Sequence, residues 1–261
     1  MSQRKVELSA LITEVLRRHP QLSYFQGYHD ICQVFLLVLG PEAAVAAVEH
    51  ISLLRIRDFM LPSMSPSLLH LRLLPPLLHR VDPKLCKHLS TTQPFFALAA
   101  TLTLYAHDIQ EYADIARLFD VFLAMPPVFP VYLFAEIVRG RREELFEIPD
   151  DEPEMLHSVL SKLPRPLDLE GMVGRAVGLL REVPVEGLSG WRKVASASVL
   201  RKEGGDLEEG EQLLAKQCQE LQWEKRKKVV WEVVVKNKGP VLVGMSVLVV
   251  VLGVVLARKV R

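Results

Sequence analysis

The run QLSYFQGYHDICQVFLLVLGP, residues 21–41, joins a loop to a very apolar segment of helical length. Pro20 precedes the run and ends the helical pattern before it, because proline lacks the N–H that a helix interior needs. Gly27 opens the next helix, since glycine permits a tight turn of the backbone. Gly40 and Pro41 end it. The stretch therefore predicts a short loop held between two helices.

The rest of the first 180 residues repeats this design of short helices separated by prolines. Apolar residues recur at helical spacing, and no alternating strand is followed by a hairpin turn. Several prolines stand where a first helical turn begins, a position that tolerates a missing N–H. The predicted fold class is therefore all-α. Further helices are expected over residues 6–18, 42–57, 67–80, 94–105, 112–124, 130–142, 154–163 and 168–181.

Residues 240–257, PVLVGMSVLVVVLGVVLA, carry no charge. A helix of this length spans roughly 27 Å, close to the thickness of a thin bilayer core. The alternative, a buried strand or core helix, fits less well because only four residues follow it to pack against. More basic residues lie before the segment than after it, which predicts a tail anchor with the main domain in the cytosol.

Composition excludes several other functions. The formal net charge is +1, so the chain carries no nucleic-acid signature. Its three cysteines are far apart and form no CxxC pair, which indicates a reducing compartment and no zinc ribbon. The sequence has no GxxxxGK[ST], HExxH or GxSxG motif. No cofactor or metal is therefore expected. Four segments are predicted: a helical domain over 1–182, a Gly- and Ser-rich linker over 183–210, a charged helix over 211–238 and the anchor.

The loop within residues 21–41 carries the side chain best suited to chemistry. Tyr24 can anchor the loop through its ring and hydroxyl group. Gln26 projects an amide that both donates and accepts hydrogen bonds, and Gly27 lets another molecule approach the backbone. Such an amide can orient a water molecule for attack on a phosphate. The alternative from the residues alone is that Gln26 caps the following helix.

YFQGYHDI, residues 24–31, resembles the YxQG glutamine-finger motif of the TBC family of Rab GTPase-activating proteins. RLFDVFL, residues 117–123, is similar to the family's RLWDxFL segment, with Phe119 in the aromatic position. With IRDFM at residues 56–60 and a terminal anchor, the order resembles the subgroup anchored in the endoplasmic reticulum. The resemblance covers roughly residues 5–182 and the anchor.

The resemblance implies that Gln26 replaces the Rab's own glutamine in positioning the attacking water, with Tyr24, Gly27 and Asp30 as supporting motif residues. It implies a structural role for Arg117 and Asp120, which are spaced to form an ion pair along one helix. GTP and magnesium would belong to the partner Rab. The chain would then be no enzyme itself but an activator acting in trans in vesicle transport at the endoplasmic reticulum or an early secretory membrane.

One family motif has no match. The family's arginine finger lies in an IxxDxxR motif upstream of YxQG, and Arg4, Arg17 and Arg18 do not stand in that pattern. We therefore expect that the N-terminal part of the domain is missing from this sequence. Two alternatives remain open: a Rab-binding or tethering module with weak or no activating power, and a membrane-bound scaffold unrelated to Rabs. The scaffold would be favoured if Gln26 were buried and bonded to its own backbone.

Overall fold

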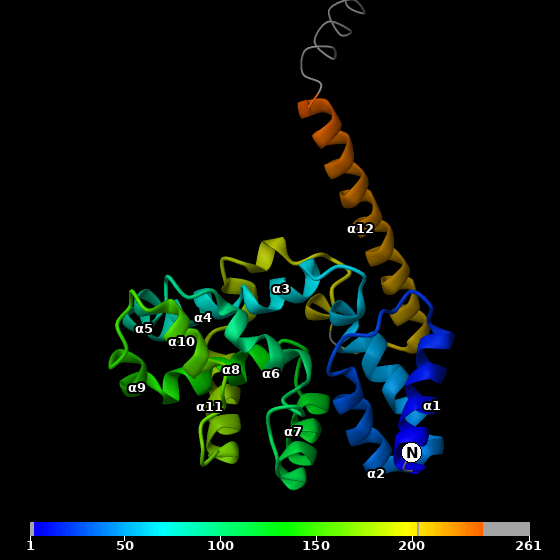
Figure 1. Ribbon diagram of the computed structural model, residues 1–261, viewed down its shortest axis with the longest axis horizontal. Coiled ribbons are helices and arrows are strands. Elements are labelled where there is room, and N and C mark those ends of the chain that lie inside the picture. The colour runs from blue at the N-terminus through cyan, green and yellow to red at the C-terminus, as the bar shows by residue number, and fades with distance from the viewer. Residues whose placement is uncertain (1–2, 203, 237–261) are drawn as a thin grey trace, which may run out of the picture. The chain divides into compact units, whose positions relative to one another are not determined.

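The computed structural model describes residues 3–202 and 204–236, and all regular elements in that part of the chain are helices (Figure 1). This confirms the all-α class. The predicted anchor at residues 240–257 lies outside the described residues. The α-helices are α1 Gln3–Arg18, α2 Tyr28–Leu54, α3 Ser65–Leu71, α4 Leu74–Val81, α5 Pro83–His88, α6 Leu98–Leu102, α7 Tyr112–Ala124, α8 Phe129–Gly140, α9 Arg142–Phe146, α10 Pro153–Leu160, α11 Leu169–Glu182 and α12 Leu207–Lys236. Short 3-10 turns are η1 Arg57–Met60, η2 Pro94–Ala97, η3 Val185–Gly187, η4 Trp191–Lys193 and η5 Val199–Arg201.

Helix α2 is a helical hairpin that turns back on itself. Gly40 interrupts it with φ 75° and ψ 171°, and Pro41 begins the second arm. The hydroxyl groups of Tyr28 and Ser52, one from each arm, are 2.8 Å apart. In a straight helix these residues would be separated by roughly 36 Å, at 1.5 Å per residue. The predicted stop at Gly40 and Pro41 is therefore a sharp reversal of the chain.

This reversal bears on membrane association. Within the described part of the chain, α2 is the one helix long and apolar enough to cross a bilayer by length and composition. Its two arms, however, lie antiparallel, and about half of its residues are buried in the fold. Core helices of soluble domains share this composition, so α2 is best explained as a core element.

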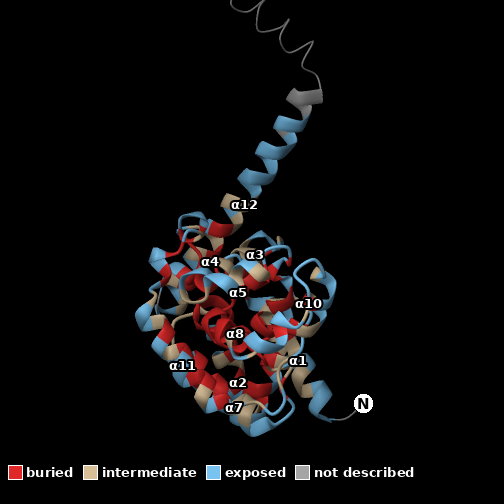
Figure 2. Ribbon diagram, turned by 90° about the vertical axis from the view of Figure 1, so that its left-hand side faces the viewer, coloured by how far each residue is buried: buried red, intermediate tan, exposed pale blue. Residues whose placement is uncertain are grey.

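Helix α8 forms the centre of the core. Every residue from Phe129 to Val138 is buried, and α8 contacts α4, α6 and α11 (Figure 2). A helix that is apolar all round must be surrounded on every side. The buried hydroxyl of Tyr132 donates to the carbonyl oxygen of Val183 at 2.7 Å, which ties α8 to the end of α11.

Several predicted helices are shorter than expected. The helix predicted over residues 67–80 is two helices, α3 and α4, because Pro75 and Pro76 at the start of α4 have no N–H to bond to the preceding turn. The helix predicted over residues 130–142 ends at Gly140, and α9 begins two residues later. The helix over residues 112–124 has the predicted bounds.

The segment predicted as a linker, residues 183–210, is packed against the fold over most of its length. Apolar side chains stand among its glycines and serines, and the removal of these side chains from water drives the packing. The buried ones are Val185, Leu188, Trp191, Val194, Ala197, Val199 and Leu200. The Arg201 guanidinium lies 4.2 Å from the centre of the Trp191 ring. The first compact unit accordingly extends to Ala215, and a second unit begins at Lys216.

A buried polar centre, which we call the Arg57–Asp58 centre, holds this segment in place. The Asp58 carboxylate accepts hydrogen bonds from His70 Nε2 at 2.9 Å and Ser198 Oγ at 2.5 Å. Arg57 donates to the carbonyl oxygens of Leu53 and Ala197. Burial lowers the pKa of Arg57, which the neighbouring Asp58 partly offsets. Charges this deeply buried are tolerated because their polar atoms are bonded.

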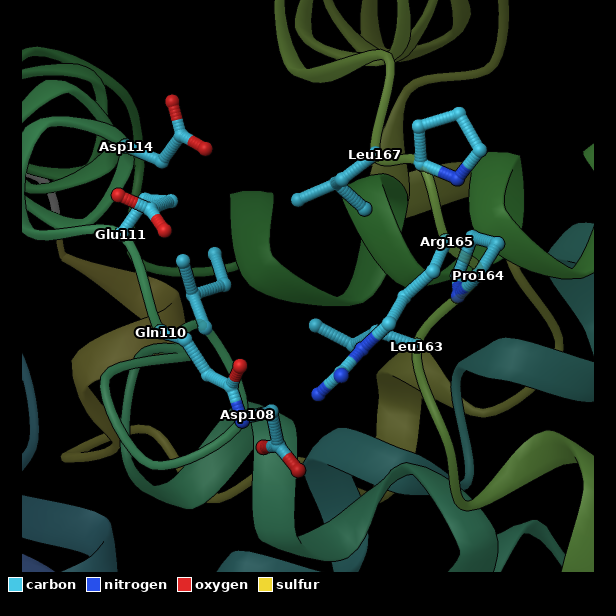
Figure 3. Close-up of a pocket in the computed structure, with 10 residues that line it drawn as sticks. Asp108, Gln110, Glu111, Asp114, Leu163, Pro164, Arg165 and Leu167 are labelled. Carbon is cyan, nitrogen blue, oxygen red and sulfur yellow. The ribbon is translucent and has the colours of Figure 1, made fainter.

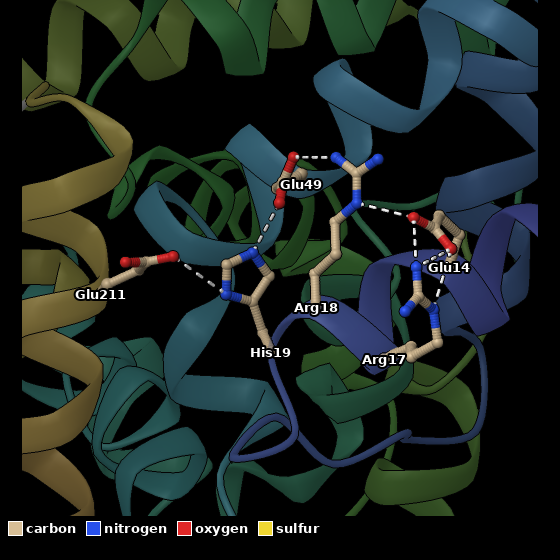
Figure 4. Close-up of polar contacts among 6 residues, drawn as sticks. All are labelled: Glu14, Arg17, Arg18, His19, Glu49 and Glu211. Carbon is tan, nitrogen blue, oxygen red and sulfur yellow. Dashed lines mark hydrogen bonds and ion pairs between the residues drawn. The ribbon is translucent and has the colours of Figure 1, made fainter.

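A second polar cluster fixes the chain just before the loop of Gln26 (Figure 4). His19 is buried, and its Nε2 lies 2.7 Å from Oε1 of Glu49 on the second arm of α2. Its Nδ1 lies 3.5 Å from Oε1 of Glu211 at the start of α12. Arg18 adds an ion pair to Glu49 at 3.1 Å. The loop therefore starts from a point that is bonded to two other elements.

Candidate functional site

The loop of Gln26, which we call the finger loop and define as residues 21–27, is fixed from beneath by backbone and aromatic contacts. The N–H of Ser23 donates to the carbonyl oxygen of Met60 at 2.6 Å. The half-buried Phe25 ring lies 5.7 Å from the Tyr28 ring and 6.4 Å from the Phe59 ring, edge-on to the latter. Tyr28 is fully buried. Because these rings fill the inner side, the neighbouring side chains point outward.

Gln26 is exposed at the outer side of this loop, next to the half-exposed Tyr24. Among the described residues, its amide forms no hydrogen bond with its own backbone. The buried and self-bonded glutamine that would have favoured an unrelated scaffold is therefore not observed. Nor does Gln26 cap α2: Gly27 is the N-cap residue, and no side chain bonds the helix end there. The amide is available to a partner.

Gly27 could not be another residue without a rearrangement. Its φ is 102°, a left-handed conformation that side chains with a Cβ rarely adopt. A Cβ atom at this position would also lie 2.5 Å from Cγ2 of Thr103, well inside contact distance. The backbone that carries Gln26 therefore rests directly on the turn that follows α6.

A chain of polar contacts runs beside Gln26. Tyr24 Oη lies 2.8 Å from His29 Nδ1, and His29 Nε2 lies 3.3 Å from Oδ1 of Asp30. The other carboxylate oxygen of Asp30 lies 3.1 Å from Nδ1 of His107. Partial burial, with the nearby Asp30 charge, raises the pKa of Tyr24, so its hydroxyl keeps its proton at neutral pH. Asp30 therefore contacts one histidine of its own helix and one histidine from the turn after α6.

No local sequence pattern indicated the two residues that contact the loop from elsewhere in the chain, Thr103 and His107. Both come from the turn after α6, where Leu104 and Tyr105 have φ values of 50° and 64°. Each left-handed residue costs about 1–2 kcal/mol, and the buried Tyr105 hydroxyl, which bonds the carbonyl oxygen of Pro130 at 2.9 Å, helps to hold the turn. Asp30 and His107 are 77 residues apart, so a local sequence pattern could not predict their contact.

The role predicted for Arg117 and Asp120 requires a correction. Arg117 does not bond Asp120; it donates to both carboxylate oxygens of Glu170, at 2.7 and 3.2 Å. This two-pronged pair connects α7 to α11. A planar guanidinium suits such bidentate pairing with a carboxylate. The contact that Arg117 makes is therefore to a partner 53 residues away, and not along its own helix.

The arginines nearest in sequence to the finger loop are engaged with acidic side chains. Arg17 and Arg18 both bond Glu14 on the same helix, and Arg18 also bonds Glu49. In the described part of the chain, no hydrogen bond or ion pair links Arg17 or Arg18 to Gln26. Among the described residues, Gln26 is thus exposed on its loop, and no arginine forms a hydrogen bond with it.

The structure thus shows an all-helical domain with an exposed glutamine on a loop that is held from beneath. Comparison with known proteins identifies the family of this domain. A model of the Rab-GTPase-TBC domain matches residues 2–146, which is more than half of the chain. The protein belongs to this family.

Two of the similar proteins are named as GTPase-activating proteins, and a third is named as a TBC1 domain family member. The chain is 33% identical over 231 residues to the GTPase-activating protein gyp10 of Schizosaccharomyces pombe, covering 85% of this chain and 62% of the relative. It is 37% identical over 180 residues to human TBC1 domain family member 20, covering 68% of this chain and 44% of the relative. GTPase-activating protein GYP8 of Saccharomyces cerevisiae is 26% identical over 170 residues, 53% of this chain and 34% of the relative. The chain thus spans about half the length of the curated relatives it matches.

Proposed function

We propose that this protein stimulates GTP hydrolysis by a Rab GTPase and that Gln26 is the side chain it contributes. The proposal is carried by one observation: Gln26 is exposed on a loop whose inner side is fixed by Phe25, Tyr28 and Gly27. A loop backbone held in this way loses little freedom when a partner binds, so it can present the Gln26 amide to a water molecule. Its family membership supplies the Rab as the partner.

In this mechanism the Rab holds GTP and magnesium, and the activator completes the site. The carbonyl oxygen of the Gln26 side chain accepts a hydrogen bond from the attacking water, and the amide N–H₂ donates toward the γ-phosphate. Tyr24 and Asp30 keep the loop in place from either side through His29 and His107. No step uses a group that titrates near neutral pH on the activator, because an amide does not ionise.

The test is single-turnover GTP hydrolysis by a panel of purified Rabs with the full chain in mild detergent. Gln26→Ala is expected to lower the stimulated rate for the responding Rab by at least about 100-fold, the range typical of a lost positioning group. Gln21→Ala is the matched control, since Gln21 is also exposed on the finger loop. Equal stimulation by wild type and Gln26→Ala would rule out the glutamine as the contributed group.

A second candidate function is a Rab-binding or tethering module with little activating power. It is favoured by the state of the arginines nearest the finger loop: neither Arg17 nor Arg18 stands in an IxxDxxR pattern, and both bond Glu14. An arginine finger contributes about 10³ to 10⁵ in rate, so an activator without one is slow. This reading predicts binding to a GTP-loaded Rab with no change in the hydrolysis rate, which the same panel measures.

We propose that residues 240–257 attach the protein to an early secretory membrane such as the endoplasmic reticulum, with the helical domain in the cytosol. The proposal is supported by the uncharged composition of this segment and the basic residues before it. Extraction of the full chain from membranes by alkaline carbonate would contradict the anchor. Removal of residues 240–261 is expected to release the helical domain into the soluble fraction.

A further inference from the structure

A cleft of about 400 Å³ lies beside the turn that supports the finger loop (Figure 3). One wall is the segment from Asp108 to Asp114, which enters α7, and the other is the segment from Leu163 to Leu167, which leads into α11. His107, the residue before the first wall, lies 3.1 Å from Asp30 of the finger motif. The cleft therefore begins one residue after a direct contact to the finger motif.

The two walls carry opposite charge. Asp108, Glu111 and Asp114 stand on the first wall, and Arg165 extends from the opposite one. Among the described residues, none of these four side chains forms an ion pair. Three carboxylates against one guanidinium leave the cleft with an acidic balance. Leu163 and Leu167 add an apolar surface between the charges.

Asp108 is the residue in the cleft that most needs a partner. Its Oδ2 atom is buried and has no hydrogen-bond partner among the described residues. Burial raises the pKa of this carboxyl; the neighbouring His107 lowers it and Asp30 raises it again. An unsatisfied buried carboxylate oxygen destabilises a fold, and such groups are uncommon in native proteins. Oδ2 is out of reach of solvent, so a partner would meet Asp108 through the part of the residue that lines the cleft.

We propose that this cleft receives a lysine or arginine side chain of the GTP-loaded Rab, with Asp108 as its acceptor. The proposal rests on the proposed function, which supplies the partner. The apolar surface of Leu163 and Leu167 accommodates the aliphatic stem of such a side chain, while the carboxylates meet its charged end. The positive charge of Arg165 on the opposite wall repels a second basic residue. This repulsion restricts the orientation in which the Rab can place its side chain in the cleft.

The experiment measures equilibrium binding of the full chain, in mild detergent, to Rabs loaded with a non-hydrolysable GTP analogue. For the Rab that binds wild type most tightly, Asp108→Asn is expected to weaken binding about 10- to 100-fold. Asp151→Asn, a change at an exposed aspartate away from the cleft, should leave binding unchanged. Arg165→Gln, which removes the positive charge from the opposite wall, should tighten binding. The affinity of wild type should fall more steeply with added salt than that of Asp108→Asn.

The outcomes separate this proposal from the function on which it rests. Wild-type binding that Asp108→Asn does not alter overturns the cleft assignment and leaves the proposed function in place. Loss of binding in Arg165→Gln with tighter binding in Asp108→Asn shows an acidic occupant and also overturns it. If no Rab binds wild type, the proposed function fails, and the occupant assigned here fails with it. The melting temperature of Asp108→Asn is the folding control: a fall of more than about 5 °C would show that the carboxylate supports the fold, contrary to the proposal.

Discussion

The Arg57–Asp58 centre and the finger loop are both polar regions at the start of short turns, yet they use polarity in opposite ways. Asp58 is buried and accepts bonds from His70, Ser198 and the backbone of Val199. Gln26 is exposed and bonds none of its own backbone. The first region uses its hydrogen-bonding groups to join distant segments. The second region leaves one amide exposed, and the aromatic rings behind that amide hold the loop in place.

The difference shows where a change should affect stability and where it should affect activity. In the Arg57–Asp58 centre, loss of the Asp58 carboxylate leaves buried donors without their acceptor and the Arg57 charge without that counter-charge. On the outer side of the finger loop, a lost side chain leaves only solvent-exposed surface. Asp108 differs from both: it is only partly buried, whereas Asp58 is fully buried, and one of its oxygens has no hydrogen-bond partner among the described residues. Three substitutions test this ordering.

The largest effect is expected for Asp58→Ala. It removes the acceptor for His70 Nε2 and Ser198 Oγ and leaves the buried Arg57 without its nearest negative charge. Breaking a buried charge pair in this way costs about 3–5 kcal/mol of unfolding free energy. Urea denaturation followed by circular dichroism measures it. Asp151→Ala, at an exposed aspartate, is the control. A loss below about 1 kcal/mol would mean that the centre does not hold the fold together.

An intermediate effect is expected for Gly27→Ala, which forces a Cβ toward Cγ2 of Thr103 in a left-handed backbone. The conformational and packing costs together are about 2–4 kcal/mol. Adding Thr103→Ser removes the clashing methyl group and should restore part of the stability. Gly178→Ala is the matched control, because a Cβ there meets nothing within 4 Å and alanine favours a helix. A double variant no more stable than Gly27→Ala would show that the contact with Thr103 is unimportant.

The smallest effect is expected for Asp108→Asn, and it should depend on pH. Burial raises the folded-state pKa of Asp108 above its ordinary value of 3.8, so the folded protein binds this proton more tightly than the unfolded chain. The stability linked to that proton is complete below the ordinary value and is lost as pH rises through the folded-state pKa. Asp108→Asn should therefore be at least as stable as wild type at pH 7, and its advantage should shrink at pH 4.

Parallel urea titrations of wild type, Asp108→Asn and Asp151→Asn at both pH values measure this change. An Asp108→Asn variant clearly less stable than wild type at pH 7 would place Asp108 with Asp58, as a residue that supports the fold. The sign of the difference is the informative quantity, because the group is only partly buried and solvent screens it.

Local patterns predicted much of the helical architecture. The bounds of α7, the start of α2 after Gly27 and the stop at Gly40 follow from periodicity and from glycine and proline chemistry. The packed state of residues 183–202 could not be predicted in the same way. Its glycines and serines are typical of linkers, and its burial depends on Asp58, about 140 residues earlier, accepting bonds from Ser198 and Val199.

The sequence by itself determined that the chain is helical, where most helices begin and end, and which glutamine stands beside a glycine in a loop. These are properties of neighbouring residues, and they act through backbone conformation and spacing. Only the tertiary structure decided that α2 folds back, that Arg117 bonds Glu170, and that Thr103 and His107 hold the loop of Gln26. Those outcomes depend on side chains that meet across 24 to 77 residues, and their pairing is selected by packing of the whole core.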